Sequence, residues 1–286
     1  MLALPVGGLQ HDRLLSRLLD FGHFPLFAVV FYCVLGFLPR KAPGSRRWGV
    51  AVVATLLINL IAECIQPLFG RSSGLADWFI GCAGCLSAAL LNLPKEAGYT
   101  FIRCTVVSSL LLVSLLPVGM VVFDRYAART GFPLLSSFES PLELDRWQCH
   151  GCTIRRSRKN ATDGCYALKI KTEKKASYPG LFLVDMSRNW SDMESLRFDI
   201  FWPQGAGARL WARIDDMPCP AFGDRVQIAI PLHPGTNRIT LSRELVSTTS
   251  GGKALDLKAI QSFGLFLENG VPGLVFHLDN VALNLK

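Results

Sequence analysis

The chain has 286 residues, of which 50% are hydrophobic and 18% are charged, with a formal net charge of +8 and a mean hydropathy of +0.31. This composition excludes a disordered, highly charged tail and is unusual for a soluble enzyme. Residues 1–125 contain 16 of the charged side chains, whereas residues 126–286 contain 36. We therefore expect two domains, 1–125 and 132–286, with a linker at 126–131.

Four apolar stretches predict a four-helix transmembrane bundle within residues 1–125. A membrane-spanning helix needs ~20 mostly apolar residues. Residues 48–69 and 101–123 have this length, and residues 76–93 are slightly shorter. Residues 24–38 are shorter still, but a basic segment follows them in place of a signal-peptide cleavage pattern. We therefore interpret them as a span that extends backwards to Leu18.

Basic residues between the first two predicted spans indicate the orientation. The short loop contains Arg40, Lys41, Arg46 and Arg47, and such clusters favour the cytoplasmic side. The chain is thus predicted to be a multi-pass protein of a bacterial inner or cytoplasmic membrane. Because the number of spans is even, residues 132–286 are expected to be extracytoplasmic.

Polar residues near the ends of these spans predict a pocket at one membrane face. His23 begins the first span, Glu63 and Gln66 end the second, Arg71 follows, and Asp77 begins the third. Ionisable groups in a membrane are costly and therefore mark functional sites by default. Glu63 or Asp77 could act as a general base with His23 as an acid, or Gln66 and Arg71 could bind a ligand. Alternatively, Glu63 and Arg71 form an ion pair that only holds the helices together.

Residues 18–125 resemble the VanZ-like family. The resemblance rests on Asp20-Phe-Gly-His23-Phe24, on Glu63-Cys-Ile-Gln66 followed by Arg71-Ser-Ser, and on Asp77 with Gly84. It implies an integral membrane protein of a family whose founding members are linked to glycopeptide-antibiotic tolerance. The family usually has Asn four residues after the Asp, and this chain has Gly81 there, which puts in doubt any activity that needs the amide.

The second domain is predicted to be an all-β sandwich, because short alternating runs occur between Gly, Pro, Asn and Asp residues. In residues 209–215, one face consists of Leu210, Ala212 and Ile214, and the other presents Arg209, Trp211, Arg213 and Asp215. An aromatic ring among charged groups suits a sugar, whose CH groups stack on the ring while its hydroxyls form hydrogen bonds. Alternatively, Trp211 lies under a loop or against lipid headgroups.

The order of these strands resembles jelly-roll carbohydrate-binding modules of the galactose-binding-like type. The resemblance rests on Ser137-Phe138-Glu139, on residues 196–200 and on Phe276-His-Leu-Asp279-Asn-Val. It implies a glycan ligand and a structural Ca²⁺ held by Glu139 and Asp279, which are oxygen donors of the kind that Ca²⁺ requires. The alternative is that both residues are solvated acids.

Four of the nine cysteines lie in the second domain: Cys149, Cys152, Cys165 and Cys219. In an oxidising compartment they predict two disulfides, with three possible connectivities. Cys149 and Cys152 with His150 could instead form half of a zinc site, or the thiols could be free. The basic residues are not accompanied by a nucleic-acid-binding motif, so no nucleic-acid partner is expected.

These patterns predict a membrane-anchored cell-envelope protein that binds a glycan or glycoconjugate through its outer β-sandwich. Two alternatives remain open. One is a membrane-embedded enzyme that acts on a lipid-linked or cell-wall substrate by carboxylate and histidine acid–base chemistry. The other is a structural assembly subunit. Neither the ligand nor the oligomeric state follows from the sequence.

Overall fold

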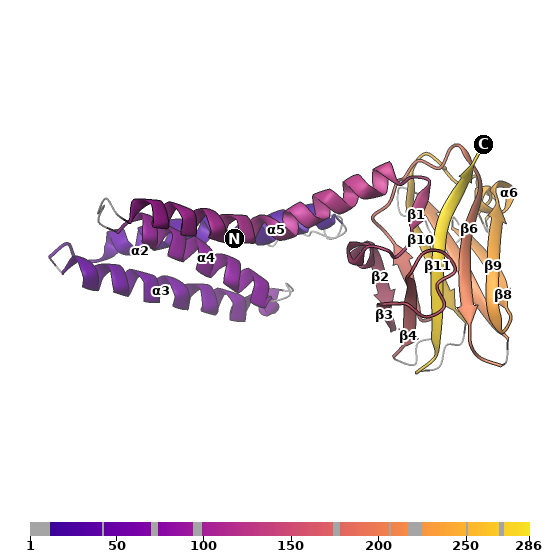
Figure 1. Cartoon of the computed structure of the whole chain (residues 1–286), viewed down its shortest axis with the longest axis horizontal. Coiled ribbons are helices and arrows are strands. Elements are labelled where there is room, and N and C mark those ends of the chain that lie inside the picture. The colour runs from indigo at the N-terminus through magenta and orange to yellow at the C-terminus, as the bar shows by residue number, and fades with distance from the viewer. Residues whose placement is uncertain are drawn as a thin grey trace. The chain divides into compact units, whose positions relative to one another are not determined.

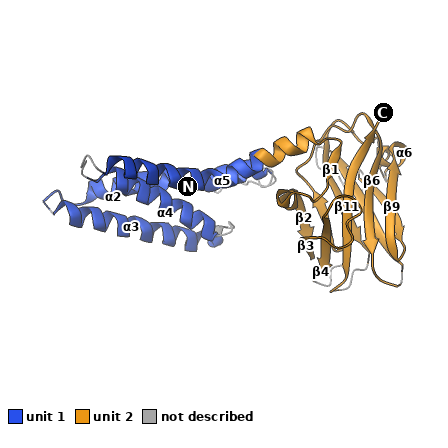
Figure 2. Ribbon diagram, viewed as in Figure 1, with its two compact units in different colours: residues 1–122 blue, residues 123–286 orange. Residues whose placement is uncertain are grey.

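A computed structural model describes residues 12–41, 43–69, 74–93, 99–173, 178–205, 207–216, 225–249, 251–268 and 272–286. The chain divides into two compact units, Met1–Val122 and Phe123–Lys286 (Figure 2). The first unit is helical and the second is rich in strands (Figure 1).

The first unit is built on three packed helices. Its elements are α1 (Arg13–Phe21), α2 (His23–Phe37), α3 (Gly44–Ile65), the short 3₁₀ helix η1 (Gln66–Phe69), α4 (Leu75–Leu91) and most of α5 (Thr100–Thr130). Helices α2, α3 and α4 pack against one another. Gly84 of α4 makes this possible, because a Cβ there would collide with the main-chain oxygen of Phe24 on α2.

Three helices are long and apolar enough to cross a membrane: Arg13–Phe37, Gly44–Leu68 and Thr100–Thr130. They also expose many large apolar side chains, including Phe37, Leu112 and Phe101, and an exposed apolar surface of this extent is typical of contact with lipid. Helix α4 has 17 residues, which gives it a length of ~25 Å against a hydrocarbon thickness of ~30 Å. Three of the four predicted spans therefore have the required length, and the span at 76–93 remains a prediction.

Helix α5 continues through most of the stretch that the sequence analysis interprets as a linker. It ends at Thr130, so residues 126–130 are helical. Two features explain the difference. The residues Tyr126-Ala-Ala-Arg129 are compatible with a helix, and Asp124, which already belongs to the second unit, is buried against Arg146 of the same unit. Polar composition in this stretch thus marks the end of the apolar segment and not the end of the helix.

The second unit is a β-sandwich of two antiparallel sheets, as predicted. In the first sheet the strand order is β3 (Cys152–Ser157), β4 (Ala167–Thr172), β11 (Val275–Leu285), β6 (Met193–Trp202) and β9 (Gly235–Ser242), with β1 (Leu134–Ser136) also paired to β11. In the second sheet it is β2 (Trp147–His150), β5 (Gly180–Leu183), β10 (Ile260–Leu267), β7 (Ala208–Asp216) and β8 (Val226–Leu232). The 3₁₀ helix η2 (Pro141–Arg146) and helix α6 (Arg243–Ser247) complete the unit.

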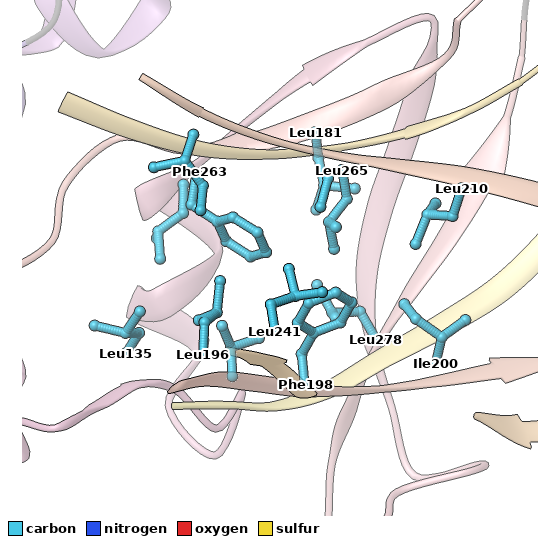
Figure 3. Close-up of a cluster of buried hydrophobic side chains, with 14 of the residues drawn as sticks. Leu135, Leu181, Leu196, Phe198, Ile200, Leu210, Leu241, Phe263, Leu265 and Leu278 are labelled. Atoms are coloured by element: carbon cyan, nitrogen blue, oxygen red, sulfur yellow. The ribbon is translucent and has the colours of Figure 1, made fainter. Parts of the chain in front are cut away.

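Alternation along the strands explains why the two sheets pack together. Successive side chains of a strand point to opposite faces, and Phe198 and Ile200 of β6 face the core together with Leu278 of β11. Phe263 and Leu265 of β10 meet them from the other sheet, as Figure 3 shows. All five of these side chains are fully buried, so the core of the second unit lies between the two sheets.

Candidate functional site

A polar cluster joins α2, α3 and η1 in the helical unit. The Nε2 atom of His23 lies 3.6 Å from Oε1 of Glu63. The side-chain amide nitrogen of Gln66 donates to Glu63 Oε1 at 3.0 Å and lies 3.4 Å from His23 Nε2. The His23 and Glu63 side chains are only 10% and 7% exposed. The structure therefore brings together three residues that the sequence analysis selected.

The helices explain how these side chains reach one another. Thr55, Asn59 and Glu63 are four residues apart and form the buried face of α3. His23 begins α2, and its Nδ1 atom lies 3.0 Å from the Asp20 carbonyl oxygen. When Nδ1 carries the proton and donates to that carbonyl, Nε2 is an acceptor for the Gln66 amide nitrogen, which lies 3.4 Å away. The arrangement thus holds an imidazole and a carboxylate 3.6 Å apart in a nearly buried position.

Asp77 lies near the same cluster, with Gly74 as the residue that contacts both carboxylates. The backbone N–H of Gly74 donates to Glu63 Oε2 at 3.4 Å, and a Cβ on Gly74 would lie 3.2 Å from Asp77 Oδ2. The two carboxylates therefore lie on either side of one residue. Arg71, the cation expected in the same pocket, lies outside the described residues.

Asn59 is a polar residue of this region whose role the sequence analysis missed. Its amide nitrogen donates to the Trp78 carbonyl oxygen at 2.9 Å, and the side chain is 1% exposed. A Cβ on Gly81 would lie 2.6 Å from that nitrogen and 2.7 Å from the Asn59 oxygen. The missing side chain at position 81 thus makes room for the amide of Asn59. The spacing of Asn59 and Glu63 was a signal for this role, but the contact with Gly81 required the helix packing.

The outward face of the second sheet contains the predicted sugar-facing strand. Leu210, Ala212 and Ile214 of β7 are buried, as expected from the alternation. Trp211 is partly exposed and lies opposite Phe266 of β10. The sequence analysis therefore predicted correctly which side chains of β7 face the core. The role of the outward residues in binding stays a prediction.

Two phenylalanines extend this surface, and the sequence analysis missed both. The rings of Phe182 on β5 and Phe266 on β10 are 4.6 Å apart at 72°. Between them lies Gly264, where a Cβ would come within 2.7 Å of Phe182 and 2.9 Å of Phe266. The missing side chain lets both rings lie across the sheet. We call Trp211, Phe182 and Phe266 the aromatic face.

Charged groups surround the aromatic face. Glu268 lies 3.3 Å from the Arg209 guanidinium and accepts from the Trp211 indole nitrogen at 3.4 Å. The side chains of Arg209 and Glu268 are 59% and 23% exposed, so their remaining hydrogen-bonding groups are accessible to a ligand. The pair supplies donors and acceptors beside the Trp211 ring.

Asp215 has a different position from its neighbours on β7. Its carboxylate is 6% exposed and accepts from Arg213 Nε and Nη2 at 2.9 and 2.8 Å and from Ser262 Oγ at 3.1 Å. The Arg213 guanidinium lies 5.6 Å from the Phe182 ring centroid. Asp215 therefore orients Arg213 against the aromatic face, and its buried oxygens are already engaged.

Glu139 and Asp279, the predicted calcium ligands, both hold the loop between β3 and β4. Glu139 accepts from the backbone N–H groups of Cys165 and Tyr166 at 2.7 and 2.8 Å. Asp279 accepts from Thr162 and Asp163, and burial raises its pKa although these hydrogen bonds lower it. Within the described parts of the chain, no group of three or more His, Cys, Asp or Glu side chains is arranged to hold a metal. The calcium site stays a prediction.

The cysteine predictions are tested by the structure only in part. Cys149, Cys152 and Cys165 are free thiols, and Cys219 lies outside the described residues. Cys149 and Cys165 are exposed, whereas Cys152 is buried. The predicted disulfides and the half zinc site stay predictions.

Comparisons with known proteins do not assign a family. No protein-family model matches this sequence, and no curated protein matches it.

Among solved structures, an exo-β-agarase is similar over 54% of this chain, with 19% identity and a TM-score of 0.43. The match covers 25% of the agarase chain. A family 11 carbohydrate-binding module from Clostridium thermocellum, in complex with a β-1,3-1,4-mixed-linked tetrasaccharide, matches over 52% of this chain and 93% of its own, with 18% identity and a TM-score of 0.40. A xylan-binding domain of family 22 matches over 53% of this chain and 92% of its own, with 13% identity and a TM-score of 0.36.

Proposed function

We propose that this chain is a membrane-anchored protein of the cell envelope that binds a glycan on its aromatic face. The observation that carries the proposal is the placement of three partly exposed rings on one sheet surface, with the Arg209–Glu268 pair at its side. A sugar presents CH groups that stack on aromatic rings and hydroxyls that hydrogen-bond to charged groups. The arrangement offers both kinds of contact to one ligand.

The anchoring part of the proposal rests on the helical unit. Three of its helices have the length and composition of membrane spans, and their exposed surface is rich in large apolar side chains. The loop with Arg40, Lys41, Arg46 and Arg47 favours the cytoplasm. With four spans, the sandwich then lies outside the cytoplasm, where envelope glycans occur.

Binding to soluble polysaccharides tests the glycan proposal on the full chain in detergent. Affinity electrophoresis against mixed-linkage β-glucan, xylan and soluble peptidoglycan fragments provides the screen. We expect at least one to retard the wild type, and Trp211→Ala or Phe266→Ala to weaken the interaction at least about tenfold, since each ring contributes about 1.4 kcal/mol or more. Leu245→Ala, at an exposed apolar residue on α6, is the control. Retardation unchanged in Trp211→Ala, or absent with all three ligands, contradicts the proposal.

A second candidate function is acid–base catalysis in the membrane, favoured by the 3.6 Å separation of His23 and Glu63. In this alternative Glu63 accepts a proton from a lipid-linked substrate and His23 returns it. Glu63→Gln keeps the size of the side chain and one acceptor oxygen but removes the base. We expect this variant to fold and to lose turnover of a lipid-linked cell-wall precursor, whereas Cys64→Ser, at an exposed neighbour, retains it. Equal turnover in both variants contradicts this alternative.

A further inference from the structure

Cys149 and Cys152 lie where the chain passes from one sheet of the sandwich to the other. Cys149 belongs to β2 of the second sheet, and Cys152 begins β3 of the first. Only His150 and Gly151 separate them, and Gly151 has a φ of +62°, a conformation that glycine adopts without strain. The turn thus brings two thiols together by backbone geometry.

The two thiols differ in exposure and in partners. Cys149 is exposed, whereas Cys152 is 8% exposed. The Cys152 thiol donates to the Gly180 carbonyl oxygen at 3.1 Å, and the Cys149 side chain is its neighbour across the turn. One thiol can therefore meet a reagent from solution, and the other is held behind it.

The two side chains also shift each other's acidity. The interaction with Cys152 lowers the pKa of Cys149, against the opposing effects of burial and of the nearby Glu173 carboxylate. The interaction with Cys149, together with burial, raises the pKa of Cys152. Because the thiolate is the nucleophile in thiol chemistry, Cys149 is the residue that attacks and Cys152 keeps its proton until a later step.

We propose that Cys149 and Cys152 form a redox-active pair that undergoes thiol–disulfide exchange with a small disulfide. The Cys149 thiolate attacks one sulfur of the disulfide RSSR, forms a mixed disulfide and releases RS⁻, which takes up a proton. Cys152 then loses its proton and attacks the Cys149 sulfur, which expels the second RS⁻. The products are the Cys149–Cys152 disulfide and two RSH, so the two cysteines are oxidised and RSSR is reduced.

A metal site is the competing use of this motif, and the surroundings do not favour it. A structural zinc needs four ligands. In the described part of the chain no third His, Cys, Asp or Glu side chain joins the pair in an arrangement that could hold a metal. The redox proposal needs only the two sulfurs and access to one of them.

Peptide mass spectrometry on the full chain in detergent, treated with oxidised glutathione at pH 7, tests the proposal. We expect the wild type to form the Cys149–Cys152 disulfide with little retained glutathione. Cys152→Ser should accumulate a glutathione adduct on Cys149, because the resolving thiol is missing. Cys149→Ser should leave Cys152 unmodified, because that sulfur is buried. Cys165, exposed in the same unit, is the internal control, and we expect Cys149 to react at least about fivefold faster because the neighbouring Cys152 lowers its pKa.

Three results would overturn the proposal. The first is modification of Cys149 no faster than that of Cys165. The second is an equal yield of glutathione adduct on Cys149 in the wild type and in Cys152→Ser. The third is a wild-type disulfide that joins Cys149 to Cys165 or Cys219. Because Ser replaces Cys with little change in size, a near-UV circular dichroism spectrum matching the wild type checks that each variant is folded.

Discussion

Buried charges hold the end of α5 to the sandwich of the second unit. Arg146 donates from Nε to one carboxylate oxygen of Asp124 at 2.9 Å and from Nη2 to the other at 2.6 Å. The two side chains are 6% and 2% exposed. Such a pair tolerates the loss of one partner poorly, because the other charge is then left buried without compensation.

We expect Asp124→Asn to lower the free energy of unfolding of the second unit by about 3–5 kcal/mol. Arg125→Ala is the control, because the neighbouring Arg125–Asp185 pair is less buried, with side chains that are 28% and 17% exposed, and we expect a smaller loss. Urea unfolding of the full chain in detergent, followed by near-UV circular dichroism, measures both. Equal losses in the two variants would show that burial does not decide the effect.

His277 makes the stability of the sandwich depend on pH. Burial, followed by the charges of Lys169 and Lys159, lowers the pKa of His277 below its ordinary value of 6.5. The unfolded chain therefore takes up a proton near pH 6.5 while the folded chain does not, and stability falls as the pH drops from 6.5 to the folded pKa. Asn160 Nδ2 lies 3.2 Å from His277 Nδ1, a contact in which neutral histidine can accept.

We expect His277→Gln to reduce the loss of stability between pH 7 and pH 5.5, and His233→Gln, at an exposed histidine, to leave it unchanged. Thermal unfolding midpoints measured at several pH values over this range give the comparison. A pH dependence that is the same in all three proteins would mean that His277 keeps its ordinary pKa.

At the scale of elements, the packing of α4 against α2 depends on Gly84, and Gly36 of α2 offers a comparison. A Cβ on Gly84 would collide with the backbone of α2, whereas a Cβ on Gly36 of α2 would meet nothing within 4 Å. Backbone cannot move aside as a flexible side chain can. We therefore expect Gly84→Ala to lower the melting temperature in detergent by at least about 5 °C, since a core clash costs about 1–3 kcal/mol. Gly36→Ala should leave it unchanged or raise it slightly. A similar melting temperature for both variants would contradict the close approach of α2 and α4.

The loop between β3 and β4 depends on Asp279 of β11. Its carboxylate accepts backbone N–H groups from Thr162 at 2.6 Å and from Asn280 at 2.8 Å. We expect Asp279→Asn to cost about 1–3 kcal/mol, because a buried hydrogen-bonded acceptor is lost. Thermal unfolding with CaCl₂ and with EDTA separates the two roles. The calcium prediction requires that CaCl₂ stabilise the wild type but not the variant, and equal midpoints in CaCl₂ and EDTA would contradict it.

Strand periodicity was the part of the fold that could be predicted most directly. Leu210, Ala212 and Ile214 of β7 face the core, and the residues between them face outward. This alternation can be read from the strand's own sequence, because one face of β7 is buried and the other is not. The aromatic face was only partly predictable. Phe182 and Gly264 become neighbours through the pairing of β5 with β10, and no local pattern shows which distant residues will pair. The end of α5 was missed for a similar reason, because the partner of Asp124 lies on another element.

Part of the polar cluster could also be predicted, from the spacing of residues along the helices. Glu63 and Gln66 lie on one side of the chain by their separation, and the parity of the predicted spans places His23 at the same membrane face. The space that Gly81 leaves for Asn59 is set by how closely α3 and α4 approach. Interhelical distance follows from side-chain fit across two segments, which a single segment does not encode.

At the scale of the whole molecule, the order of the strands constrains when the second unit can form. Strand β11 is the last along the chain, yet it lies in the middle of the first sheet, between β4 and β6, and it also pairs with β1. Until β11 has been synthesised, β4 and β6 lack the strand that joins them. The sandwich is therefore expected to emerge from the ribosome incomplete and to close only after its final strand has been made.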